Sequence, residues 1–265
     1  MEIIGITGTK GFVGKNLIKK LKKTNKKYVC FKGNLLNKKS LENFFKRNNP
    51  TTIIHLAGTF NPPFKDQING NLLTTWNILE IGLNHKLKKI IYASSYAVYG
   101  EAKKPFIEKD KLNPTTSYAL SKVFAEDCIN FYTNKKKINS IILRFSNIYG
   151  KNNNKGVIHD FIKKIKINKK IIINGNGNQS RNFIHVNDAC TAIIKSIDYK
   201  NSAIFNIGST KEINLNQLAN ELKKKYIFEI NYINPKNKQE SYLINSNKAK
   251  KLLKFTPKFE NIQEY

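Results

Sequence analysis

The sequence predicts an α/β protein with a doubly wound parallel sheet and a smaller C-terminal α/β region. Short apolar runs alternate with segments of helical periodicity along the 265 residues, the pattern of a parallel sheet covered by helices. A glycine-rich turn joins the first apolar run to the first helical segment. A chain of this length buries a sizeable core, as one large domain or two small ones.

A strand, a glycine turn and a helix follow one another at the N-terminus. Residues 3–6 are apolar, as in a buried parallel strand. Glycines there permit a tight turn and let a pyrophosphate approach the helix N-terminus, whose free N–H groups favour anions. The residues of this predicted dinucleotide site are Gly8, Gly11, Phe12, Val13 and Gly14. A glycine-rich turn without a ligand is the alternative.

The second strand is predicted to be short, over residues 28–31. A ribose 2′-hydroxyl is usually held by an acid about 20 residues beyond the glycines, but no acid lies between Glu2 and Glu42. Lys32 stands near the end of this strand, where a cation suits a 2′-phosphate. This favours NADP slightly over NAD, while an ordinary residue of a lysine-rich chain is the alternative.

A helical pattern over residues 115–132 carries Tyr118 and Lys122. Residues four apart lie on one face of a helix, so the two side chains point the same way. A phenol with a pKa of about 10 is a poor base at neutral pH, and a nearby ammonium favours the phenolate. The pair suits proton transfer. Two ordinary residues on an amphipathic helix, which would show the same spacing, are the alternative.

The glycine turn, Tyr118 and Lys122 together resemble the extended short-chain dehydrogenase/reductases, specifically the nucleotide-sugar epimerase/dehydratase family. Further segments are similar to the family in its order: residues 53–58 (its fourth strand and the turn beneath the adenosine), 71–80 (a helix), 90–100 (the strand and loop of the catalytic hydroxyl), and 143–150 and 181–188 (the substrate side). The resemblance spans nearly the whole chain.

This resemblance implies a domain organisation. Residues 1–150 would form a Rossmann-type dinucleotide-binding domain, and residues 151–265 mainly a substrate-binding region. Segments near 182–197 and 204–208 would return to the Rossmann domain. Tyr265 ends the chain where such proteins often have another helix, which leaves a shortened C-terminus and a truncated product both open.

The resemblance also implies residue roles. Ser95 would hydrogen-bond the substrate oxygen whose proton Tyr118 exchanges, and Lys122 would lower the pKa of Tyr118 and contact the nicotinamide ribose. The cofactor-binding residues would be Gly8, Gly11, Phe12, Val13, Gly14, Lys32, Leu56, Ala57, Gly58, Tyr118 and Lys122. The nucleotide sugar would be bound by Ser94, Ser95, Tyr96, Asn147 and Arg181. No metal is expected.

Two positions narrow the reaction. The family's dehydratases carry Asp-Glu where this chain has Tyr96 and Ala97, which cannot supply that acid/base pair. Fucose-synthase-like enzymes place a cysteine at the second of these positions for epimerisation next to a ketone. Ala97 cannot supply that chemistry either. We therefore expect redox chemistry at sugar carbon 4, with a 4-keto-sugar reductase as first choice because the missing acid suits a cofactor that is released. A UDP-glucose 4-epimerase-like enzyme is the alternative, and a non-catalytic dinucleotide sensor is a remote one.

Composition excludes other classes. The net charge of +29 would suit nucleic acid, but only three of the 47 basic residues are arginine and the lysines are spread along the chain. No specific nucleic-acid partner is expected. The three cysteines are isolated and lack metal spacing, which indicates a reducing cytoplasm.

Membrane attachment is not expected, and self-association is. No apolar run approaches the roughly 18 residues of a membrane span, and the N-terminus lacks the pattern of a signal peptide. Family members commonly dimerise through two helices per subunit, which match about residues 69–83 and 115–132. A cytoplasmic homodimer is predicted.

Overall fold

A six-stranded sheet forms the centre of the computed structural model, which describes residues 2–101, 104–136, 138–209, 211–234, 241–259 and 262. The strand order is β2-β1-β3-β4-β5-β9, and every pairing is parallel. The direction of winding reverses between β1 and β3, where open α/β sheets bind ligands. The strands are β1 (Ile4–Thr7), β2 (Tyr28–Cys30), β3 (Thr52–His55), β4 (Lys89–Ser95), β5 (Asn139–Phe145) and β9 (Ala203–Ile207).

A row of isoleucines fixes the register across the middle of this sheet. Ile6 pairs with Ile54, Ile54 with Ile91, and Ile91 with Ile141. All four are at most 1% exposed and belong to one hydrophobic cluster. A slip of one residue in any strand would move its isoleucine to the opposite face, so this row specifies the pairing.

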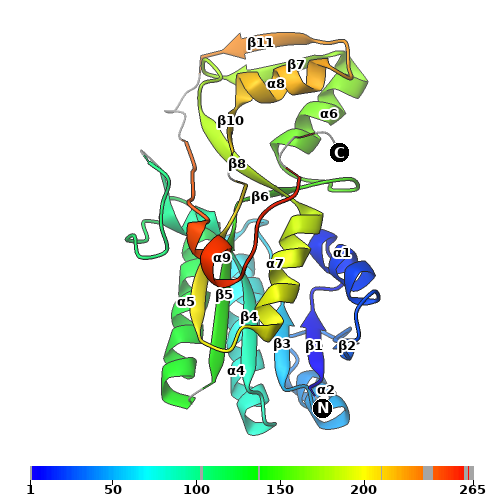
Figure 1. The fold of residues 1–265 in the computed structure, drawn as a ribbon, viewed down its shortest axis with the longest axis vertical. Coiled ribbons are helices and arrows are strands. Elements are labelled where there is room, and N and C mark those ends of the chain that lie inside the picture. The colour runs from blue at the N-terminus through cyan, green and yellow to red at the C-terminus, as the bar shows by residue number, and fades with distance from the viewer. Residues whose placement is uncertain are drawn as a thin grey trace.

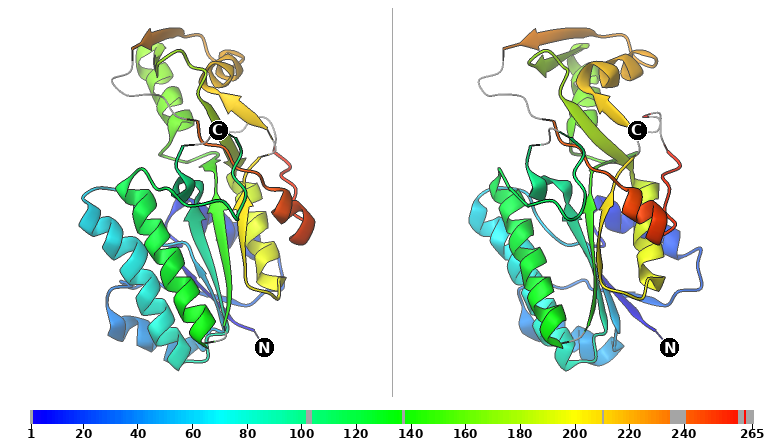
Figure 2. Two further views of the ribbon diagram at one scale, coloured as in Figure 1. Left: turned by 90° about the vertical axis from the view of Figure 1, so that its left-hand side faces the viewer. Right: turned by 60° about the vertical axis from the view of Figure 1, so that its left-hand side comes forward.

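Helices cover both faces of the sheet (Figure 2). One face carries α1 (Phe12–Leu21), α7 (Val186–Asp198) and α9 (Asn247–Leu252), whose apolar residues join the isoleucine row. The other carries α2 (Lys38–Asn48), α4 (Thr74–Asn84) and α5 (Ser117–Lys136). The doubly wound α/β class predicted from the sequence is thereby confirmed.

A second lobe stands on the carboxyl edge of the sheet (Figure 1). It contains a three-stranded sheet of order β10-β8-β6 and a parallel pair, β11-β7. Leu218, Leu222 and Phe161 are among the residues of its own core. Its elements are β6 (Asn147–Tyr149), α6 (Val157–Asn168), β7 (Lys170–Asn174), β8 (Ser180–His185), β10 (Glu212–Asn214), α8 (Leu215–Lys223) and β11 (Glu229–Ile233).

The chain crosses between the lobes more than once. After β8 it returns to the large sheet as α7 and β9, and then passes back to β10. The placement of a domain boundary at residue 150 stays a prediction. Along the described residues, no helix combines the length and apolar character that crossing a membrane requires.

Two details differ from the sequence-based expectation. Residues 53–58 were expected to contain a fourth strand, but β3 is the third strand of the chain, because none of the described residues 31–37 forms a strand. The helix expected over 69–83 is continuous but begins as α3 (Phe64–Gln67) and a wide π-helical segment, η1 (Ile68–Leu73), before α4. A short 3₁₀ turn, η2 (Tyr96–Tyr99), follows β4.

Candidate active site

A cavity of about 910 Å³ lies between the carboxyl edge of the large sheet and the second lobe. It is the crevice in which doubly wound sheets hold their ligands. The sequence-predicted residues that line it come from the glycine turn, the segment after β3, the end of β4, α5 and β6. They are Gly11, Phe12, Gly58, Ser94, Ser95, Tyr96, Tyr118 and Asn147.

The glycine turn closes on the segment after β3. Gly8 has a φ of +70°, and a Cβ there would stand 2.5 Å from the amide nitrogen of Ala57. A Cβ on Gly14 would collide with the carbonyl oxygen of Gly8. Leu56 and Ala57 therefore pack behind the turn and do not line the cavity.

The N-terminus of α1 is left open toward the cavity. Gly11 caps this helix without a side chain, and its first turn carries no acid. A Cβ on Gly11 would approach only the Gly8 carbonyl oxygen, at 3.3 Å. Free N–H groups beside open space, with no competing carboxylate, fit a dinucleotide pyrophosphate. Val13 is half-buried and packs against the core.

Ser95 and Tyr118 meet in the cavity. Burial raises the pKa of Tyr118 to about 12, a hydrogen bond with Ser95 opposes that rise, and the nearby Tyr96 adds to it. The Ser95 hydroxyl oxygen also accepts from the backbone N–H of Ala97 at 3.2 Å, which orients it at the start of η2. At neutral pH the Tyr118 phenol is protonated and can donate.

Lys122 lies one turn along α5 from Tyr118, as the sequence predicts. Its ammonium donates to the Tyr92 hydroxyl at 3.1 Å and to the Ala93 carbonyl at 2.9 Å, and stands 6.0 Å from the centre of the Tyr118 ring. Burial lowers the pKa of Lys122 to about 8, against the opposing charge of Glu126.

The expectation that Lys122 lowers the pKa of Tyr118 differs from the structure. The contact that lowers this pKa is Ser95, because the ammonium is bound to groups on β4.

Behind Ser94 lies a buried ion pair. Arg144 on β5 and Glu126 on α5 are 2.6 Å apart, with side chains only 4% and 2% exposed. Ser94 donates to the same carboxylate, and the Arg144 guanidinium also donates to the Tyr99 hydroxyl at 2.7 Å. This network ties α5 to β4 and β5 at the level of Ser95 and Tyr118.

Of the five predicted substrate residues, Ser94, Ser95, Tyr96 and Asn147 line the cavity, and Arg181 lies behind them. The Tyr96 hydroxyl donates to the side-chain oxygen of Asn147 at 3.2 Å, and both residues line the cavity. Arg181 stacks on the ring of Tyr242 at 4.9 Å, and Tyr242 in turn meets Tyr96 edge-on. Arg181 does not line the cavity itself, but its charge lowers the pKa of Tyr96 against the larger effect of burial.

Lys32 lies apart from the cavity. It lines a separate shallow hollow beside α2, together with Lys39 and Arg47. Sequence reasoning had noted Lys32 alone, because the two other cations become its neighbours only when α2 folds beside β2.

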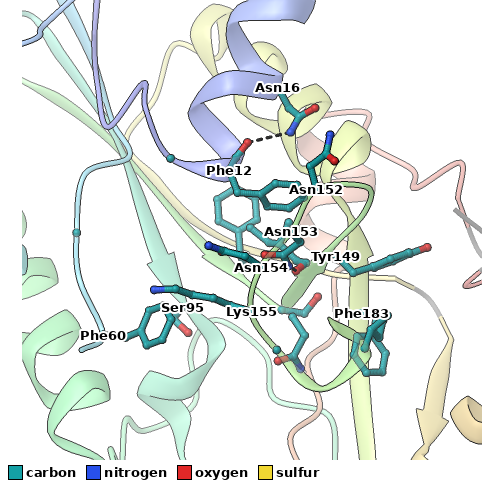
Figure 3. Close-up of a pocket in the computed structure, with 18 of the residues that line it drawn as sticks. Phe12, Asn16, Phe60, Ser95, Tyr149, Asn152, Asn153, Asn154, Lys155 and Phe183 are labelled. Atoms are coloured by element: carbon teal, nitrogen blue, oxygen red, sulfur yellow. Dashed lines mark hydrogen bonds between the residues drawn. The ribbon is translucent and has the colours of Figure 1, made fainter. Parts of the chain in front are cut away.

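The segment between β6 and α6 reaches across the cavity (Figure 3). Lys155 in this segment places its ammonium 3.9 Å from the ring centre of Phe60, and Phe60 meets the ring of Tyr118 edge-on at 6.1 Å. Sequence reasoning missed both residues, because both lie in loops, after β3 and after β6, and loops carry no periodicity. The regular spacing of Tyr118, Lys122 and Glu126 along α5 could have identified Glu126.

An open glycine turn at the winding reversal, with a serine, a tyrosine and a lysine gathered opposite it, is the arrangement of a Rossmann-type dinucleotide-dependent enzyme. The sequence model of the NAD dependent epimerase/dehydratase family matches residues 4–208. The chain belongs to this family of extended short-chain dehydrogenase/reductases, and is therefore an enzyme of an NAD-dependent family.

Individual relatives differ in their named reactions. The chain is 34% identical over 251 residues to a putative UDP-glucose 4-epimerase of Methanocaldococcus jannaschii, with 83% of this chain and 81% of the relative covered. It is 35% identical over 202 residues to the dTDP-4-dehydro-6-deoxyglucose reductase of Escherichia coli, covering 71% of this chain but only 63% of the relative.

Similarity of fold extends further than similarity of sequence. The crystal structure of a Thermotoga maritima UDP-glucose 4-epimerase with UDP-glucose superposes with a TM-score of 0.89, over 97% of this chain and 94% of that one, at 23% identity.

Proposed function

We propose that this enzyme transfers hydride at carbon 4 of a nucleotide-linked sugar, with Ser95, Tyr118 and Lys122 as its catalytic residues. The observation that carries the proposal is the convergence of Ser95 and Tyr118 in the cavity that the open glycine turn also borders, close enough for Ser95 to lower the pKa of Tyr118. A remote alternative, a dinucleotide sensor without catalysis, would not need these three residues together.

The proposed roles follow from the geometry. NAD(P), when bound, supplies or accepts the hydride. The hydroxyls of Ser95 and Tyr118 converge on the oxygen at carbon 4, Ser95 as a hydrogen-bond donor and Tyr118 as the group that gives or takes its proton. Such positioned proton transfer contributes about 10²–10⁴-fold to rate. The Lys122 ammonium, 6.0 Å from the centre of the Tyr118 ring, offers a donor to the ribose.

We favour the reducing direction, as a 4-keto-sugar reductase. Reduction of a ketone needs a proton donor at the nascent alkoxide, and a Tyr118 pKa of about 12 keeps the phenol protonated at neutral pH. A reductase must also release its oxidised cofactor after each turnover. The described residues from 31 to 37, which follow β2, contain no carboxylate to hold the adenosine ribose.

The second candidate is a nucleotide-sugar 4-epimerase. The match to the Methanocaldococcus relative named as a putative UDP-glucose 4-epimerase, over more than four fifths of both chains, supports it. An epimerase returns the hydride to the opposite face of the same sugar, so it keeps its cofactor throughout the cycle. Dehydration is not proposed, because Tyr96 and Ala97 occupy the positions where it needs an acid and a base.

For the cofactor we favour NADP over NAD. Lys32, Lys39 and Arg47 line one hollow beside the end of β2, and a 2′-phosphate placed there would meet positive charge. Arginine and lysine both suit phosphate, arginine through a fixed fork of donors.

We also propose a homodimer that works in the cytoplasm. Exposed large apolar side chains lie on η1, on α4 and on α5, namely Leu73, Trp76, Phe124 and Phe131. Contiguous exposed apolar surface marks an interaction site, and α4 packs beside α5 (Figure 2). Free thiols at Cys30, Cys128 and Cys190 suit a reducing compartment.

A direct assay separates the two reactions. As a reductase, the purified protein emerges largely free of dinucleotide and oxidises NADPH only when given a nucleotide-linked 4-keto-6-deoxy sugar. As an epimerase, it copurifies with tightly bound NAD⁺ and interconverts gluco and galacto nucleotide sugars without added cofactor. Failure of both reactions, across UDP-, dTDP-, GDP- and CDP-sugars, would refute the proposed function.

A further inference from the structure

A row of polar residues crosses the apolar sheet beneath Lys122. Thr7 pairs with His55, and His55 with Tyr92, at adjacent register positions of β1, β3 and β4. All three are at most 1% exposed. Polar side chains so deeply buried require hydrogen-bond partners. At the Tyr92 end of this row, the partner is the Lys122 ammonium.

The hydrogen bonds of the row have a defined direction. Thr75 on α4 donates its single hydroxyl proton to the Asn71 carbonyl at 2.6 Å, so its oxygen can only accept from other groups. It accepts from Nε2 of His55 at 3.2 Å, and the Tyr92 hydroxyl lies next to it. Nδ1 of His55 therefore accepts from Thr7, at 2.7 Å.

The Tyr92 oxygen, at the end of this row, is an acceptor for Lys122. It accepts from the Lys122 ammonium at 3.1 Å. The ammonium also lies 4.7 Å from the centre of the Tyr92 ring and donates to the Ala93 carbonyl. An ammonium has three donors, and Gly58, which lines the cavity, is its neighbour on the remaining side.

The titratable groups around Lys122 keep this site favourable to a single positive charge. Burial, aided by the Lys122 charge, lowers the pKa of His55 to about 3, so that ring stays neutral. Burial raises the pKa of Tyr92 well above its usual value, and that of Tyr118 to about 12. Glu126 is the carboxylate whose charge supports the ammonium.

We infer that Tyr92 is a positioning residue, which holds the Lys122 ammonium beside Tyr118 through a hydroxyl oriented by Thr75 and His55. The inference rests on the proposed function only in the role given to Lys122. Without the Tyr92 oxygen, the buried ammonium would lose an acceptor for its charged form. It would then release its proton at a lower pH.

The test substitutes Tyr92→Phe, which removes the oxygen and keeps the ring. Lysine Cε is labelled with ¹³C, the Lys122 signal is assigned by its loss in Lys122→Met, and its titration is followed by NMR. The midpoint is expected to fall by about one pH unit, the size of one hydrogen bond to a charged group. The alkaline limb of kcat/KM is expected to move by the same amount, with kcat affected more than KM.

Tyr99→Phe is the matched control. Tyr99 is also a buried tyrosine whose hydroxyl has two partners, Arg144 and Asn206, but it makes no hydrogen bond to Lys122. Its loss should leave the Lys122 midpoint in place. Thr75→Val, which removes only the hydroxyl that orients Tyr92, should lower the Lys122 midpoint by a smaller amount. If Tyr92→Phe does not fold, the Lys122 midpoint in Thr75→Val tests the inference instead.

An unchanged Lys122 midpoint in folded Tyr92→Phe, or in folded Thr75→Val should Tyr92→Phe not fold, would overturn the inference. So would an equal shift in Tyr99→Phe, because the effect would then be a general loss of packing. The NMR titration needs neither substrate nor cofactor. A wild-type protein that turns over no nucleotide sugar would refute the proposed function while leaving the measured role of Tyr92 intact.

Discussion

The buried Glu126–Arg144 pair gives a stability prediction whose size follows from its burial. Substituting Glu126→Gln removes the negative charge and nearly preserves the shape of the side chain. The Arg144 guanidinium then remains only 4% exposed with the neutral Tyr99 hydroxyl as a partner. Breaking a buried pair from one side costs about 3–5 kcal/mol, a large share of the roughly 5–15 kcal/mol that stabilises a typical domain.

Equilibrium urea unfolding measures this cost, read from the transition midpoint at constant slope. Glu80→Gln is the matched control, because Glu80 pairs with Lys38 at the surface with side chains 43% and 57% exposed, and such pairs contribute only about 0–1 kcal/mol. Equal losses in the two variants would refute the reasoning. In folded Glu126→Gln the pKa of Lys122 should also fall, since the Glu126 charge raises it.

Three further predictions concern the cofactor and the assembly. Gly14→Ala would drive the new Cβ against the Gly8 carbonyl. It should weaken NADPH binding at least about tenfold in a fluorescence titration, and an unchanged affinity would contradict the proposed pyrophosphate site. Wild-type protein should bind NADPH about tenfold to a hundredfold more tightly than NADH, and Lys32→Asp should erase or reverse this preference, whereas tighter binding of NADH to the wild type would overturn it. Light scattering at micromolar concentration should give a dimer mass, and Phe131→Glu should shift it toward the monomer; a monomeric wild type would refute the interface.

The sequence was sufficient to predict the parts of the fold that rest on local pattern. The apolar runs gave the strands of the large sheet, and the spacing of Tyr118 and Lys122 placed both on α5. The glycine turn was predictable because the close approach of Gly8 to Ala57 leaves no room for a side chain, a constraint that appears directly as residue type.

Contacts between distant segments could not be predicted in this way. Tyr92, Thr75 and His55 come from three separate elements, and only the register of β3 and β4 together with the packing of α4 brings them to Lys122. Lys155 meets Phe60 because the loop after β6 reaches over the cavity. For the same reason, the spacing of residues along α5 could not predict that the Lys122 ammonium binds groups on β4.

The central claim is that Tyr118 transfers the proton at sugar carbon 4. Its most direct test is the rate of hydride transfer in Tyr118→Phe, measured as NADPH absorbance in a single turnover with the nucleotide sugar that the wild type accepts. The phenol hydroxyl is the only group removed, so NADPH affinity and unfolding behaviour should remain near those of the wild type. The account predicts a rate lower by about 10²–10⁴-fold. A variant that folds, binds the cofactor and retains more than about a tenth of the wild-type rate would contradict it, because that loss falls short of what positioned proton transfer contributes.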